Sequence, residues 1–202
     1  IELVEINHSI PEASSLLIKT PRGSVFHTGD WRFDEDPVVG KPADYKALAA
    51  LKKENVLALV GDSTNVFVEG DIPSETQVRE SLTELFAKYK GKRMIVTCFA
   101  SNVGRIESIA EAAEKNGRTV CLLGRSLWRV EGAGRAAGYF RNVNVFLTDE
   151  EAAEHDPAEI LYLCTGCQGE PKAALSNISY GTGPVQPVKG DVVIFSSRVI
   201  PG

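Results

Sequence analysis

Three residues whose side chains can bind divalent metal ions each follow a short apolar run in the first part of the chain. These residues are His8, Asp30 and Asp62, which follow the predicted strands 2–6, 24–27 and 57–60. An imidazole and carboxylates at strand ends are groups from which a divalent metal site is built. The alternative is that His8 is a loop residue before Ser-Ile-Pro and that Asp30 belongs to a Gly-Asp turn. Because the placement repeats three times, it favours a metal site more than any one position does.

Four later apolar runs end in small, hydroxylic or amide residues. Their exits are 100–102, 124–126, 165–170 and 196–198. In an open α/β sheet, ligands bind outside the carboxyl ends of the strands, where helix N-termini favour phosphate. The alternative is that these residues are there as helix N-caps. Arg125 and Arg198, at two of the exits, favour an anionic ligand. The sequence has no Gly-x-Gly-x-x-Gly or P-loop pattern, so a dinucleotide or nucleoside triphosphate is not indicated.

The four cysteines give a weaker indication of chemistry. Cys98 and Cys121 lie within apolar runs and are predicted to be reduced core residues. Cys164 and Cys167 form a Cys-x-x-Cys, which is compatible with a redox pair or with half of a zinc site. Because no second cysteine pair or histidine pair completes a zinc tetrahedron, we interpret the two as thiols without a shared function.

The elements that position the first group of residues form a region of short strands. Strands are predicted at 2–6, 14–20 and 24–27, the last two joined by the turn Pro21-Arg22-Gly23. A helix follows from about Asp44, its N-cap, to residue 54, and a short buried strand at 57–60 leads to Asp62. A further helix begins with a predicted capping box at Ser74 and closes at Gly91. We place a domain boundary at this helix, giving domains 1–73 and 74–202.

From residue 93 onward the pattern changes to alternating strands and helices. Strands are predicted at 94–100, 119–124, 160–166 and 191–195, with helices near 103–116 and 126–140. A further apolar run at 143–147 precedes a capping box at Thr148, and Pro171 suits a first helical position. Near-continuous apolar strands are typical of a parallel sheet covered on both faces. The sequence therefore predicts an α/β fold.

Composition limits the kinds of partner. The chain has 22 basic and 27 acidic residues among 202, a formal net charge of −5. This balance argues against coating nucleic acid through bulk charge, so phosphate binding must come from local groups. No apolar run is long enough for a membrane span and no signal-peptide pattern is present, so we expect a cytoplasmic protein without a membrane partner. The chain begins within a predicted strand and without Met, and we expect it to be part of a longer protein.

Six motifs occur in a specific order along the chain. They are HTGDWRFD, GDSTN, FASN, GRS, TGCQGEP and FSSRVIPG. In order and spacing they closely resemble the ribonuclease J branch of the metallo-β-lactamase/β-CASP nucleases, over essentially the whole chain. The resemblance implies the C-terminal strands of a metallo-β-lactamase αββα sandwich at 1–73. A β-CASP domain with a mainly parallel sheet flanked by helices would follow at 74–202.

The resemblance also implies roles for individual residues. His8 would bind one Zn²⁺, Asp30 would bridge two Zn²⁺ ions, and Asp62 would be an acidic residue beside them, with Asp30 and Asp62 taking part in catalysis. Two metals about 3.5–4 Å apart bind a scissile phosphate and activate water. The predicted RNA- and phosphate-binding residues are Ser101, Asn102, Arg125, Ser126, Gly166, Gln168, Gly169 and Glu170. The implied activity is hydrolysis of RNA phosphodiesters, as an endonuclease, a 5′-exonuclease or both, by an intact protein that forms homo-oligomers.

Departures from the family pattern qualify this activity. The family's His-x-His-x-Asp-His metal motif does not occur in these 202 residues. Gly104 stands where many relatives have a histidine, and Cys167 replaces a usual serine. We therefore expect the chain by itself to bind metal weakly and to be inactive.

Two other functions remain open from the sequence. One is a metallo-β-lactamase-fold hydrolase of a small ester, thioester or lactam, which would give no reason for the α/β region after residue 93. The other is a non-catalytic β-CASP protein that binds RNA or acts as a scaffold.

Overall fold

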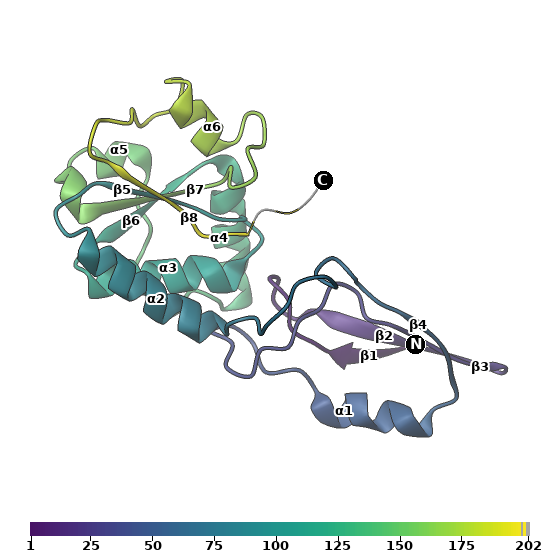
Figure 1. Cartoon of the computed structure of the whole chain (residues 1–202). Coiled ribbons are helices and arrows are strands. Elements are labelled where there is room, and N and C mark those ends of the chain that lie inside the picture. Colours follow the sequence, from purple (N-terminus) through teal and green to yellow (C-terminus); the bar gives the residue numbers. More distant parts are fainter. Residues whose placement is uncertain (199, 201–202) are drawn as a thin grey trace. The chain divides into compact units, whose positions relative to one another are not determined.

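The structure is a computed structural model that describes residues 1–198 and 200. The chain divides into two compact units, Ile1–Thr76 and Gln77–Gly202. Each unit has a four-stranded sheet of its own (Figure 1).

Unit 1 is built on a mixed sheet in the order β1-β2-β3-β4. Its strands are β1 (Glu2–Glu5), β2 (Ser14–Thr20), β3 (Gly23–His27) and β4 (Val56–Val60). The pairs β1/β2 and β2/β3 are antiparallel, whereas β4 lies parallel to β3. The connection between β3 and β4 contains helix α1 (Tyr45–Ala50) and a 3₁₀ turn (Leu51–Lys53). The predicted strands are confirmed. The predicted helix after Asp44 is also confirmed, and the Asp44 carboxylate caps it by accepting from the Ala47 amide.

The core of unit 1 is small and lies on one face of its sheet. Val4, Leu17 and Phe26 are buried, and Leu48 and Leu51 pack against them. The register explains this grouping, because Leu17 lies opposite Phe26 and successive side chains of a strand point to opposite faces.

Strand β4 differs from the prediction that it is buried. All five of its residues are exposed; Leu57 retains 63% and Leu59 69% of its accessible surface. The prediction of burial was wrong because β4 is the last strand of its sheet, and these two leucines stay mostly exposed. The apolar composition predicted the strand correctly, but it could not predict which residues would pack against that strand.

Unit 2 is built on a fully parallel sheet in the order β6-β7-β5-β8. Its strands are β5 (Met94–Thr97), β6 (Thr119–Leu123), β7 (Ile160–Cys164) and β8 (Val192–Phe195). The helices are α2 (Glu75–Lys88), α3 (Val103–Lys115), α4 (Arg125–Ala137), α5 (Asp149–Ala152) and α6 (Ala174–Ser179), with a 3₁₀ turn at Pro157–Glu159. Figure 1 shows α2 and α3 on one side of the sheet and α5 and α6 on the other. The predicted parallel sheet flanked by helices is confirmed.

Apolar residues fill both faces of the central strands. On the α5/α6 face, Ile95, Tyr162 and Ile178 belong to one buried cluster.

Cys121 and Cys164 belong to the same cluster, and burial raises the pKa of both thiols to about 12. All four cysteines are buried and none forms a disulfide. This confirms the prediction that Cys98 and Cys121 are reduced core residues.

The apolar run 143–147 pairs with β6 through a bridge between Leu147 and Cys121. One predicted element of unit 2 is different in the structure. Pro171 does not open a helix, because Lys172 takes a φ of +66° and α6 starts only at Ala174. The left-handed conformation of Lys172 interrupts the helical path, which an interpretation from Pro171 alone could not anticipate.

Candidate active site and RNA-binding pocket

In unit 1, hydrogen bonds hold the ends of β3 and β4 side by side. Thr28, directly after β3, donates its amide to Val60 O (2.9 Å) and accepts from the Asp62 amide through Oγ1 (3.1 Å). Ser15 Oγ donates to Thr28 O (2.8 Å) and so adds β2 to the same end of the sheet. Asp30 follows two residues after Thr28 and is exposed. The structure therefore places Asp30 and Asp62 at neighbouring strand exits.

Asn7 connects the end of β1 to the loop that follows Asp30. Its backbone carbonyl accepts from the Arg32 amide (2.9 Å), which makes an antiparallel bridge between the two residues. Its side chain accepts from the Ala43 amide (3.0 Å) and donates to Lys41 O (2.6 Å). His8 and Asp30 consequently lie within two residues of one bridge. Nothing in the sequence pattern singled out Asn7.

The Asp62 carboxylate is held in its ionised form. Hydrogen bonds from Thr64 Oγ1 (2.5 Å) and from the Thr64 amide (2.9 Å) lower the pKa of Asp62, and the positive charge of His8 lowers it further.

The donor types in unit 1 fit zinc, but the described residues do not complete a site. Imidazole and carboxylate are common Zn²⁺ ligands. The described part of the chain contains no group of three or more histidine, cysteine, aspartate or glutamate residues arranged to hold a metal ion. His27 is engaged elsewhere, since its Nδ1 accepts from the Gly29 amide (3.0 Å).

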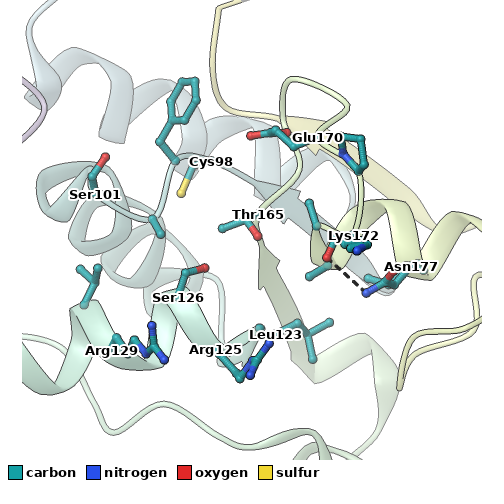
Figure 2. A pocket seen from close by; sticks show the side chains of 18 of the residues that line it. Cys98, Ser101, Leu123, Arg125, Ser126, Arg129, Thr165, Glu170, Lys172 and Asn177 are labelled. Carbon is teal, nitrogen blue, oxygen red and sulfur yellow. Dashed lines mark hydrogen bonds between the residues drawn. The ribbon is translucent and has the colours of Figure 1, made fainter.

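In unit 2, a pocket of about 950 Å³ lies outside the carboxyl ends of β5, β6 and β7 (Figure 2). Four of the eight residues predicted to bind RNA or phosphate line it: Ser101, Arg125, Ser126 and Glu170. The parallel register explains this convergence, because all three strands end at the same edge of the sheet.

The other four predicted residues do not line the pocket but shape its loops. Asn102 is the N-cap of α3, and its side chain accepts from the Arg105 amide (3.0 Å). This is the helix-capping role that the sequence left open as the alternative to ligand binding. Gln168 donates to Arg198 O (2.8 Å) and accepts from the Ile200 amide (2.9 Å), joining the loops after β7 and β8. Gly166 has a φ of +117°, and a Cβ there would lie 2.8 Å from Leu175 Cβ. Gly169 also has a positive φ. Their contact with RNA stays a prediction.

Two cationic residues of the pocket were missed from the sequence. Arg129 and Lys172 line it together with Arg125, and Glu170 is the one acidic residue among the lining residues. Figure 2 shows Arg125, Ser126 and Arg129 on the α4 side and Lys172 and Asn177 on the opposite side. The four-residue spacing of Arg125 and Arg129 could have indicated Arg129, since such residues share a helix face. The position of Lys172 depends on its unusual backbone conformation.

The start of α4 adds unpaired donors to the pocket. Its N-cap is Gly124, which has no side chain to satisfy the first amide groups. Free amides at a helix N-terminus, with the positive end of the helix dipole, favour an anion.

Comparison with known proteins gives the family. A sequence profile described as "Ribonuclease J, beta-CASP domain" matches residues 91–202, which is more than half of the chain. The chain belongs to the ribonuclease J β-CASP family. The predicted resemblance is thereby confirmed.

Proteins named Ribonuclease J match the chain over both unit 1 and unit 2. The chain is 46% identical over 203 residues to "Ribonuclease J" of Sinorhizobium meliloti and 41% identical over 206 residues to "Ribonuclease J 1" of Streptococcus pyogenes. It is 39% identical to "Ribonuclease J" of Mycobacterium tuberculosis. Each match covers 100% of this chain but 36% of the relative, so the chain spans about a third of the length of these proteins.

A solved structure shares the fold. A crystal structure of a protein of unknown function from Enterococcus faecalis V583 superimposes with a TM-score of 0.55 at 19% sequence identity. The match covers 80% of this chain and 40% of that one. Among the described residues of this β-CASP family member, no helix has the length and apolar character needed to cross a bilayer.

Proposed function

We propose that this chain is part of a metal-dependent ribonuclease that hydrolyses RNA phosphodiester bonds. The observation that carries the proposal is the match over the full chain to proteins named Ribonuclease J, at 36–46% identity. The pocket of unit 2 supports RNA as the substrate, because its lining is cationic although the whole chain has a formal net charge of −5. Local positive charge, not bulk charge, would attract the RNA backbone.

In this proposal, unit 1 contributes part of a two-zinc site. His8 would bind one zinc ion, Asp30 would bridge both ions, and Asp62 would stay ionised beside them because Thr64 stabilises its carboxylate. Bound zinc would supply an activated water and stabilise charge on the scissile phosphate. The contribution of this chain is to fix the three side chains at neighbouring strand ends through Thr28 and Asn7.

The test compares the 202-residue chain with a longer polypeptide that supplies the remaining length of the relatives. We expect the longer protein to cleave a single-stranded 5′-phosphorylated RNA in the presence of Zn²⁺. Asp30→Asn and His8→Ala should each reduce its turnover by at least about 10²-fold, because ligand geometry and charge are both lost. Cleavage products on a denaturing gel would distinguish endonuclease from 5′-exonuclease action.

Two outcomes would contradict the proposal. Zinc-dependent cleavage by the 202-residue chain alone would show that the site is complete within it. RNA binding without cleavage by the longer protein would instead favour a non-catalytic RNA-binding role, to which the pocket of unit 2 is equally suited. Preference for short esters over RNA would favour a small-ester hydrolase.

A further inference from the structure

Asp34 is a carboxylate buried in unit 1, four residues after the proposed zinc ligand Asp30. It retains 3% of its accessible surface, and a buried charge is unfavourable unless it is paired and hydrogen-bonded. Both of its oxygens are engaged. Oδ1 accepts from the Asp36 amide (3.0 Å), and Oδ2 accepts from Arg32 Nη2 and from the Glu75 amide (3.0 Å). Because Asp34 is too buried to contact RNA, any part it takes in the reaction must act through these partners.

The partners of Asp34 hold the backbone next to both proposed zinc ligands. Asn7, directly before His8, accepts from the Asp34 amide through Oδ1 (3.3 Å). The Asn7 carbonyl accepts from the Arg32 amide (2.9 Å). Arg32, two residues after Asp30, forms an ion pair with the Asp34 carboxylate. One connected network therefore includes close neighbours of His8 and of Asp30.

The same carboxylate also holds the start of helix α2. Glu75 is the first residue of α2, and the amides of a first helical turn have no partner within the helix. Asp34, 41 residues away in sequence, accepts from this amide, and its negative charge suits the positive end of the helix dipole. Thr76 Oγ1 adds a hydrogen bond to Asp36 O (3.0 Å). The loop that follows Asp30 is thus fixed to the first turn of α2.

We infer that Asp34 is a positioning residue of the proposed zinc site. It holds Arg32 and Asn7 in one arrangement and so fixes the backbone that carries the two ligands. The inference rests on the proposed zinc-dependent hydrolysis and adds a residue that neither binds metal nor touches RNA. Loss of a group that orients metal ligands typically lowers metal affinity or activity by about 10–100-fold.

Asp34→Asn tests the inference with almost no change in side-chain shape. Both carboxylate oxygens accept from N–H groups, so the amide nitrogen of asparagine would face a donor in either orientation. In the longer protein, the dissociation constant for Zn²⁺ would be measured by competition with a chromogenic chelator. We expect it to rise by about 10–100-fold. At saturating zinc, kcat for RNA cleavage should fall while KM stays within about twofold of the wild-type value, because no contact with RNA is lost.

Arg32→Met tests whether Arg32 and Asp34 act together. It removes the guanidinium that pairs with the carboxylate and should also weaken zinc binding. Combining it with Asp34→Asn should add little to the loss, because members of one network have non-additive effects. Losses that simply add would mean that the two residues act separately and would overturn the inference. Arg32 is only partly buried, so Arg32→Met carries the test if Asp34→Asn does not fold.

Two control variants separate positioning from stability. Thr76→Val removes a hydrogen bond from the same turn of α2 and leaves the Asp34 carboxylate paired. Val4→Ala lowers stability in the core of unit 1, outside the network. Both should unfold more easily in urea yet keep the wild-type zinc affinity and kcat. If Val4→Ala lost as much zinc affinity as Asp34→Asn, the stability of unit 1 alone would determine the site, and the inference would be overturned.

The outcomes distinguish this inference from the proposed function. If the longer wild-type protein binds zinc and cleaves RNA, and Asp34→Asn matches it in zinc affinity and kcat, the inference fails while the proposed function stands. If the longer wild-type protein neither binds zinc nor cleaves RNA, the proposed function fails instead.

Discussion

Single residues near the strand ends have two different kinds of role. Asn102 and Gln168 use their side chains on backbone groups of neighbouring loops. Arg125 and Arg129 have side chains with no such partner among the described residues and line the pocket. Sequence alone could not separate these roles, because an amide suits both a cap and a ligand contact.

The state of Asp62 gives a prediction at this scale. Thr64→Val removes the hydroxyl that donates to Asp62 Oδ1 and is the largest cause of its lowered pKa. We expect the pKa of Asp62 to rise towards its ordinary value of 3.8, since the charged form loses a donor. NMR titration of the carboxyl carbon would measure the shift.

Thr64→Ser is the matched control for this prediction, because it keeps the hydroxyl. Its Asp62 should titrate at the wild-type pH. An unchanged pKa in Thr64→Val would mean that the backbone amide and His8 are sufficient to hold the carboxylate ionised.

At the scale of elements, predictions succeeded where the determining signal was local. The cap at Asp44 and the capping box between Thr148 and Glu151 both occur as expected. The convergence of Ser101, Ser126 and Glu170 on one pocket followed from the parallel sheet. Prediction failed where contacts distant in sequence decide the outcome, as for β4, which was predicted to be buried and is exposed. The helix predicted at Pro171 starts only at Ala174, because Lys172 has a positive φ.

An ion pair joins two elements of unit 2 that are far apart in sequence. Arg93, just before β5, donates to both carboxylate oxygens of Asp191, just before β8 (3.1 and 2.5 Å). Burial opposes ionisation of Asp191, but its hydrogen bonds from Arg93 and the Val188 amide outweigh burial and lower its pKa. The pair therefore stabilises the folded state in the ionised form.

Arg93→Met should lower the free energy of unfolding by about 2–3 kcal/mol at neutral pH, because a largely buried carboxylate loses its partner. Since the folded pKa of Asp191 is lowered, the wild-type contribution is present above the ordinary pKa of 3.8 and is lost as the pH falls through the folded value. Urea unfolding at several pH values would measure it. Arg22→Met, on an exposed turn, should change stability by less than about 0.5 kcal/mol. A loss that does not shrink in acid would contradict the ion-pair explanation.

At the scale of the whole molecule, charge and apolar surface are unevenly distributed. The chain is acidic overall, yet the lining of the unit 2 pocket is cationic. In unit 1, β4 exposes an apolar strand at the end of its sheet. Strands of this composition are ordinarily buried on both faces. The relatives are about three times as long, so the chain contains only part of what such a protein packs together.

Strand β4 should make the 202-residue chain self-associate. An exposed apolar edge strand presents unpaired backbone groups and can pair with the same strand of a second copy. We expect the chain to form dimers or larger species as its concentration rises, detected by size-exclusion chromatography with light scattering. Leu59→Lys, at a position that is 69% exposed, should shift the equilibrium to the monomer. Its unfolding free energy should change by no more than about 0.5 kcal/mol.

Val145→Lys provides the control for this substitution. Val145 is 76% exposed in unit 2 and belongs to no strand, so the same apolar-to-charged change should leave association intact. If both variants become monomeric to the same extent, added positive charge in general opposes association and β4 has no special part in it. If only Leu59→Lys does so, the edge of the unit 1 sheet is the contact, and a charge placed there prevents a second strand from pairing with it.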